Sequence, residues 1–260
     1  MNVLLLRFRQ KHSHCSVTQD DTNDTSSLDS ESTEDVVQRL TRVQRQLEVA
    51  VLEEDYALAA RLRDQCKVIQ GSLTPVQQYV QQQVWILASA GSVEDKLKAI
   101  AGLGSAGEDA VVPSLAALLS DAEVQDAAQA ALWSIFMRCK DPIAQEALNE
   151  GCRLLGSDRK YEQAMTLFDQ VVQRCPSYAE GYNKRATLHY IERRFQESIE
   201  ECKKALSLQP HHFGAASGLG LCYLQMGDRD QALKAFDAAL MINPGLSDIR
   251  RLASDLRSQL

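Results

Sequence analysis

The amino-acid sequence predicts an all-α protein whose C-terminal half is a solenoid of stacked helix pairs. Two observations lead to this fold class. Apolar residues recur at spacings of three and four in several segments, which is the periodicity of amphipathic helices. In the C-terminal half, prolines recur every 34 residues, at Pro176, Pro210 and Pro244, and this period is typical of helical repeats. A chain of 260 residues is also long enough to bury a substantial core.

Composition excludes several classes of protein. The formal net charge is −7, which argues against nucleic-acid binding because that function needs a basic face. No apolar run approaches the roughly 18 residues of a membrane-spanning helix. The seven cysteines are odd in number, widely spread and never form a CxxC pair, so we expect reduced thiols and a reducing compartment.

The first 34 residues read as a disordered tail. Residues 20–34 are polar, acidic and almost free of apolar side chains, so they cannot bury enough surface to offset chain entropy. Residues 1–19 contain Arg7, Arg9 and Lys11 and no acid, which is weakly like an organellar transit peptide. An ordinary disordered tail is the alternative.

Residues 35–70 read as a helical hairpin. Leu40, Val43 and Leu47 belong to one apolar stripe, and an acidic turn at residues 53–55 separates it from a second stretch rich in strong helix formers. Two such helices joined by a short turn pack as an antiparallel pair.

The run EEDYALAARLRD at residues 53–64 resembles the UVR motif of bacterial excision-repair proteins, which also occurs in Clp-protease-associated and plastid Executer-type proteins. The resemblance implies a non-catalytic hairpin that binds partner proteins. It also implies that such hairpins can pair with each other. An ordinary hairpin that only packs on the rest of the chain is the alternative. The candidate partner-binding residues are Glu54, Asp55, Tyr56, Arg61, Arg63 and Asp64.

Residues 71–141 resemble HEAT-type repeats, which stack helix pairs. Pro75 begins a helix at its favoured first turn, and small residues such as Ala127 and Ala131 would let later helices approach closely. The string GLGSAG at residues 102–107 matches a dinucleotide-binding pattern, but a helix precedes it and no strand does, so a helix end and turn are favoured.

Residues 142–246 contain three repeats in one register. Several positions recur at 34-residue spacing: Ala164, Ser198 and Ala232; Phe168, Cys202 and Phe236; Cys152, Ala186 and Gly220. This pattern resembles the tetratricopeptide repeat (TPR), which implies a right-handed superhelix with a concave groove lined by the first helix of each repeat. Residues 247–260 are expected to form a capping helix.

The first helices supply the candidate groove residues. Asn149 and Asn183 share one register, and Asn side chains can both donate to and accept from a peptide backbone. Purely solvated residues in a spacer protein are the alternative. The full candidate set is Asn149, Arg153, Asn183, Thr187, Tyr190, Ser217, Leu221 and Leu224.

Some TPR proteins bind the C-terminus of a heat-shock chaperone, and particular residues of this chain bear on that function. TPR co-chaperones that grip the acidic C-terminus of heat-shock chaperones use a clamp of Lys, Asn and Arg. The equivalent positions here hold Asn149, Arg153, Lys184, Gly214 and Gly218. The two glycines remove the charges of the third repeat, so the clamp is disfavoured.

The sequence offers no catalytic, cofactor-binding or metal-binding constellation, and we expect no enzyme activity. His211 and His212 are expected in a solvated turn, with His212 packing locally, and Trp85 and Trp133 in the core. Cys202 is expected as a small core residue. Regulatory or exposed thiols are most plausible among Cys139, Cys152 and Cys175.

These observations predict a non-catalytic adaptor. Its groove would bind a peptide or helix, and its hairpin would bind a second protein or a second copy of the chain. The alternative is a regulatory or substrate-recruiting subunit of a Clp-type protease or chaperone. The combination of UVR-like, HEAT-like and TPR segments resembles plant and algal plastid proteins. This resemblance implies localisation in the chloroplast stroma, with the cytoplasm as the alternative.

Overall fold

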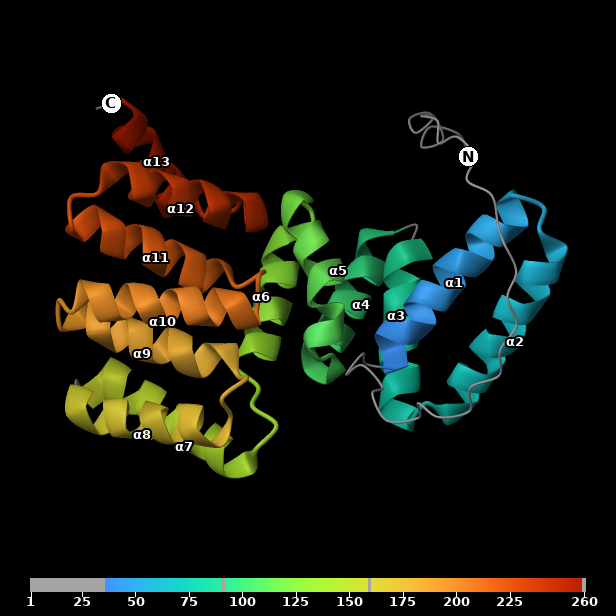
Figure 1. Ribbon diagram of the computed structural model, residues 1–260, viewed down its shortest axis with the longest axis horizontal. Coiled ribbons are helices and arrows are strands. Elements are labelled where there is room, and N and C mark those ends of the chain that lie inside the picture. Colours follow the sequence, from blue (N-terminus) through green and yellow to red (C-terminus); the bar gives the residue numbers. More distant parts are fainter. Residues whose placement is uncertain (1–35, 90–91, 159, 259–260) are drawn as a thin grey trace, which may run out of the picture. The chain divides into compact units, whose positions relative to one another are not determined.

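The computed structural model describes residues 36–89, 92–158 and 160–258, and every regular element in these ranges is helical. The all-α class is therefore confirmed (Figure 1). The tail at residues 1–34, with its possible transit segment at residues 1–19, lies outside the described residues.

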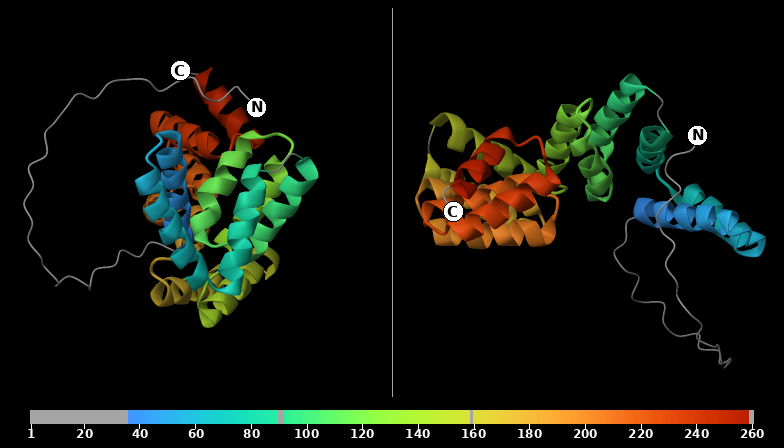
Figure 2. Two further views of the ribbon diagram at one scale, coloured as in Figure 1. Left: turned by 90° about the vertical axis from the view of Figure 1, so that its right-hand side faces the viewer. Right: turned by 90° about the horizontal axis from the view of Figure 1, so that it is seen from above.

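The hairpin consists of α1 (Val36–Leu52) and α2 (Tyr56–Ser72), which pack against each other (Figure 2). The turn is shaped by Glu54, whose φ is 59°, and by Asp55, whose side chain accepts a hydrogen bond from the backbone N–H of Leu58 at 2.9 Å. This bond caps the first turn of α2. The buried stripe between the helices comprises Leu40, Val43, Ala50, Ala59, Leu62, Cys66 and Ile69.

Four helices follow: α3 (Pro75–Ser89), α4 (Val93–Ala106), α5 (Val112–Ala117) and α6 (Gln125–Phe136). Gly102 and Gly104 lie inside α4 rather than in a phosphate-binding loop. A Cβ at Gly104 would stand 2.9 Å from the Cβ of Ala131, so the missing side chain lets α4 and α6 approach closely. The HEAT-like assignment of this segment stays a prediction.

Three helix pairs and a final helix form the C-terminal half. They are α7 (Pro142–Arg153) with α8 (Tyr161–Arg174), α9 (Ala179–Ile191) with α10 (Phe195–Leu208), α11 (Phe213–Gln225) with α12 (Arg229–Ile242), and α13 (Ser247–Arg257). Each helix packs against its successor. Phe168, Cys202 and Phe236 are buried at equivalent positions, as the 34-residue register predicts.

Helix α6 contacts three successive turns of the repeat array. They lie between α8 and α9, between α10 and α11, and between α12 and α13. At the first turn the hydroxyl of Tyr178 donates to the carbonyl oxygen of Phe136 at 2.7 Å. At the second turn Trp133 meets Phe213 edge to face, with ring centroids 5.1 Å apart. At the third turn Asn243 donates to the side chain of Gln129 at 2.6 Å.

The arrangement places α6 across one edge of the stack, beside the ends of the repeat helices (Figure 1). The three contacting residues span seven positions of α6, which is about 10 Å at 1.5 Å per residue. We name this arrangement the α6 brace. No periodicity in the sequence predicts it.

A buried polar cluster joins the second and third repeats. Glu180 and His212 are both nearly inaccessible, and the His212 Nε2 lies 2.7 Å from the Glu180 Oε2. His212 Nδ1 accepts from the backbone N–H of Ala215, so the ring proton resides on Nε2 and is donated to Glu180. Lys184 Nζ lies 2.9 Å from the other carboxylate oxygen. The carboxylate is thus held from two sides.

Two expectations from the sequence are wrong. His212 is not in a solvated turn, because it is fully buried, caps α11 and stacks on Phe136 with ring centroids 4.6 Å apart. Trp85 is not in the core, because 68% of it is exposed. The expectation for Trp133 fits better, since it is partly buried against the main core.

We expect Gly220→Ala to destabilise the protein. A Cβ at this position would stand 2.5 Å from Cε1 of Phe236 and closer still to Cδ1, and that ring is fully buried. Overpacking of this kind costs about 1–3 kcal/mol, partly offset by the better helix propensity of Ala. Chemical denaturation measures the free energy of unfolding.

Gly218→Ala is the matched control, two residues along the same helix. Its nearest neighbour would be Cys202 Sγ at an ordinary 3.4 Å, so the gain in helix propensity should make this variant equally or more stable. If both variants shift stability alike, the close contact at Gly220 is not what limits that position.

Glu180→Gln should lower stability at neutral pH by about 1–3 kcal/mol, because a buried charge-assisted hydrogen bond is weakened. Burial alone would raise the pKa of Glu180, but the hydrogen bond from His212 and the charge of Lys184 outweigh it and lower the pKa below 4.5. The stabilisation is therefore full above the unfolded-state pKa and is lost as pH falls through the folded-state value.

Thermal unfolding between pH 3 and pH 7 measures this dependence. Wild type should lose the Glu180 contribution at the acidic end, and Glu180→Gln should show a flatter profile. The exposed Glu162→Gln on α8 serves as the control and should retain the wild-type profile. Parallel profiles for wild type and Glu180→Gln would refute the assignment.

Candidate protein-binding surfaces

The end of the hairpin carries apolar side chains that nothing in the described residues covers. Leu52 at the end of α1 is 74% exposed and Tyr56 at the start of α2 is 70% exposed. Val49, Val51 and Leu58 are also exposed nearby. We call these five residues the hairpin-tip surface. Such clustering on one element is typical of an interaction site rather than of scattered surface residues.

The charged candidates of the hairpin lie in its turn and on α2, and they do not contribute to the core. Glu54 and Asp55 shape the turn, and Arg61 donates weakly to the carbonyl oxygen of Ala57 in its own helix at 3.4 Å. Arg63 and Asp64 pair with each other at 3.1 Å and are more than half exposed. These side chains remain accessible to a partner, and their role in binding stays a prediction.

Three of the candidate groove residues are exposed on the first helices of the repeats. Asn149 accepts from Gln145 at 3.0 Å, and Arg153 is paired with Glu150 one turn earlier at 2.6 Å. Thr187 donates to the carbonyl oxygen of Asn183 at 2.9 Å and is otherwise open. These residues lie on α7 and α9.

The other five candidates are more enclosed. Asn183 is 8% exposed, and its amide donates to the Glu180 carboxylate at 3.1 Å. Tyr190 is partly buried beside Phe195. The remaining three, on α11, are partly buried: Ser217, Leu221 and Leu224. A binding role for any of them stays a prediction.

The chaperone clamp has little support from the side-chain contacts. Lys184 lies 2.9 Å from buried Glu180, and although burial lowers the pKa of Lys184, the Glu180 charge outweighs that effect and raises it. Gly214 lies against Trp133 of the α6 brace, where a Cβ would come within 2.8 Å of the indole ring. Neither position presents a free cation.

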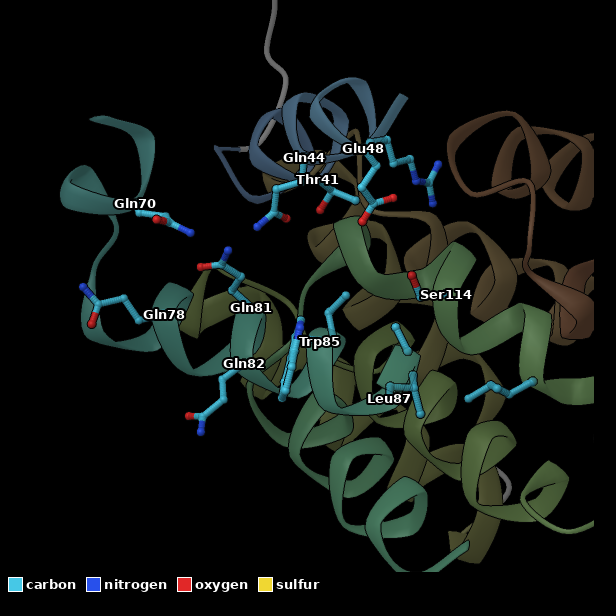
Figure 3. A pocket seen from close by; sticks show the side chains of 14 residues that line it. Thr41, Gln44, Glu48, Gln70, Gln78, Gln81, Gln82, Trp85, Leu87 and Ser114 are labelled. Carbon is cyan, nitrogen blue, oxygen red and sulfur yellow. The ribbon is translucent and has the colours of Figure 1, made fainter. Parts of the chain in front are cut away.

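A third surface was missed by sequence reasoning. Helices α1, α3 and α5 line a hollow of about 760 Å³, with Trp85 among its lining side chains (Figure 3). Five of the 14 lining side chains are glutamines, including Gln44, Gln78 and Gln81. The sequence did carry one signal of this surface. Trp85 ends the glutamine-rich run QQYVQQQVW at residues 77–85. If Trp85 were buried, some of these polar side chains would be buried with it.

Within residues 36–89, 92–158 and 160–258, no group of three or more His, Cys, Asp or Glu side chains is placed to hold a metal ion. Among the helices of these ranges, none has both the length and the apolar character needed to cross a membrane.

Family models match two parts of the chain. A model described as the UvrB/UvrC motif covers residues 38–72, and two tetratricopeptide-repeat models cover residues 148–213 and 189–256. The first match coincides with α1 and α2, and the other two span α7 to α13.

Curated relatives are similar to about a third of the chain. A TPR repeat-containing protein of Rhizobium etli is 31% identical over 87 residues, which is 34% of this chain and 43% of the relative. Anaphase-promoting complex subunit 3 of Schizosaccharomyces pombe is 30% identical over 89 residues, which is 34% of this chain and 13% of that protein. The chain thus spans less than half the length of these relatives.

Among solved structures, the TPR2B domain of yeast Sti1, determined as a complex with pHsp70, is 25% identical, with a TM-score of 0.43. The match covers 46% of this chain and 100% of that domain. From the repeat register, the helix pairs and the family matches together, the chain carries a UvrB/UvrC motif followed by tetratricopeptide repeats.

Proposed function

We propose that this protein is a non-catalytic adaptor that holds two partners, one on the hairpin-tip surface and one on the first helices of the repeats. The observation that carries the proposal is the exposure of Leu52, Tyr56 and their apolar neighbours at the end of the hairpin. Burying apolar surface contributes about 25 cal/mol per Å², so covering these side chains would favour association. The UvrB/UvrC motif over the same helices supports this use.

The repeats supply the second surface. Extended surfaces built from stacked helices are the usual binding sites of solenoid proteins. Asn149, Arg153 and Thr187 offer exposed hydrogen-bonding groups on neighbouring first helices, and Tyr190 offers a partly exposed ring. Polar groups of this kind suit an extended peptide or a helix.

The alternative is a regulatory or substrate-recruiting subunit of a Clp-type protease or chaperone, with the hairpin as the docking element. The two proposals differ in what the hairpin partner is. The basic, acid-free composition of residues 1–19 supports localisation in the chloroplast stroma, with the cytoplasm as the alternative.

The first test replaces Leu52 and Tyr56 together by Ser. Because both side chains are exposed, the melting temperature should change little, whereas recovery of the hairpin partner from native extract should fall at least tenfold. Met241→Ser is the matched control, because Met241 is an 86% exposed apolar residue on α12. Mass spectrometry of the bound fraction identifies the partner, and a Clp-type ATPase there would favour the alternative.

If the double variant recovers every partner as well as wild type does, the hairpin-tip surface is not a binding site. Sedimentation equilibrium on the same variant tests self-association. A wild-type dimer that becomes monomeric in the variant would identify the partner as a second copy of the chain, and a wild-type monomer at high concentration would eliminate that idea.

The second test places a Lys at Thr187 on α9. A bulky cation on the proposed groove surface should weaken binding of the repeat partner at least tenfold and leave the hairpin partner bound. Thr166→Lys on α8 is the control, since Thr166 is also exposed and makes the same hydrogen bond to a carbonyl oxygen four residues earlier. Equal binding by both variants would exclude Thr187 from the binding surface.

A further inference from the structure

Two cysteines that are far apart in sequence face each other where the α6 brace meets the first repeat. Cys139 lies in the connection between α6 and α7, and Cys175 follows α8, 36 residues later. Their sulfur atoms are 3.5 Å apart. The other described cysteines have no such sulfur–sulfur contact among the hydrogen bonds of the described residues, and Cys222 instead lies 3.1 Å from Ser198 Oγ.

We propose that Cys139 and Cys175 form an oxidisable dithiol, and that their disulfide fastens the connection after α6 to the turn between the first two repeats. Closing the bond to the usual 2.05 Å requires the two sulfurs to approach by about 1.5 Å. A change of this size lies within the reach of small side-chain rotations.

The backbones that carry the two sulfurs are held in place. The N–H of Cys139 donates to the side chain of Gln145 at 2.6 Å, and the N–H of Cys175 donates to the carbonyl oxygen of Val171 at 2.9 Å. Arg174 reaches across to Asp141 with two hydrogen bonds, of 3.0 and 2.8 Å. The two segments are therefore already juxtaposed before any bond forms.

Oxidant can reach the pair. Both cysteines line a pocket of about 380 Å³ that is also bordered by Lys140, Arg174 and Tyr178. Burial and the hydrogen bond with Cys139 raise the pKa of Cys175 to about 11, so this sulfur is mostly a thiol at neutral pH and only its small thiolate fraction reacts with an oxidant.

We take a peroxide as the oxidant of this pair. One thiolate attacks a peroxide oxygen, which breaks the O–O bond and leaves a sulfenic acid. The second sulfur then attacks the sulfenic sulfur, the S–S bond forms, and water leaves. With hydrogen peroxide, the two thiols are oxidised to one disulfide and the peroxide is reduced to two waters.

The test treats the full-length reduced protein with hydrogen peroxide, alkylates the remaining thiols and digests without reduction. Trypsin cuts after Arg138, Lys140, Arg174 and Lys184, so the disulfide should appear as Cys139–Lys140 joined to Cys175–Lys184. The melting temperature should rise by about 5–10 °C and return on adding dithiothreitol.

Cys139→Ser should abolish both the linked peptide and the rise in melting temperature. Cys152→Ser should abolish neither, because Cys152 is half-buried elsewhere, on α7. Linkage of Cys139 or Cys175 to any other cysteine, or oxidation of either one to sulfinic acid without linkage, would overturn the proposal. So would alkylation of both thiols in peroxide-treated protein.

Discussion

The contact of α6 with three successive inter-repeat turns is the constraint on which the arrangement of the C-terminal half depends. In a solenoid each repeat touches only its neighbours, so small errors in rotation accumulate along the stack. Here Phe136, Trp133 and Gln129 engage the turns at Tyr178, Phe213 and Asn243 in order along one helix. A single rigid element thereby sets the spacing of repeats that would otherwise be set pairwise.

The buried Glu180 cluster serves the same junction from inside. His212 connects three things at once: the carboxylate of the preceding repeat, the first turn of α11 and the ring of Phe136 on the brace. A buried carboxylate is costly unless its charge is compensated. His212 is hydrogen-bonded to one oxygen of Glu180, and Lys184 forms an ion pair with the other. These polar contacts can therefore form only when the second repeat, the third repeat and α6 have the observed arrangement.

Much of the fold was predictable because it is local. The 34-residue register placed Phe168 and Phe236 in the core, and the acidic turn separated two helices where Asp55 indeed caps α2. The brace was not predictable, since Gln129 and Asn243 are 114 residues apart and Gln129 lies outside the repeats. His212 was misjudged for the same reason: a histidine after a proline looks like turn composition until Glu180 is known to lie beside it. Exposure of the candidate groove residues also depended on neighbours that periodicity does not specify, and Asn183 is the clearest case.

The α6 brace also bears on how the repeats can deform. A free stack of helix pairs acts as a spring, because small rotations between neighbours add up to a change of pitch. Because α6 contacts three successive inter-repeat turns, the spacing of the repeats is restrained at that edge. The repeats can therefore separate only at the opposite ends of their helices. The elasticity of this array is therefore directional, and ligands that need a longer pitch encounter a stiffer protein than ligands that spread the unbraced ends of the helices.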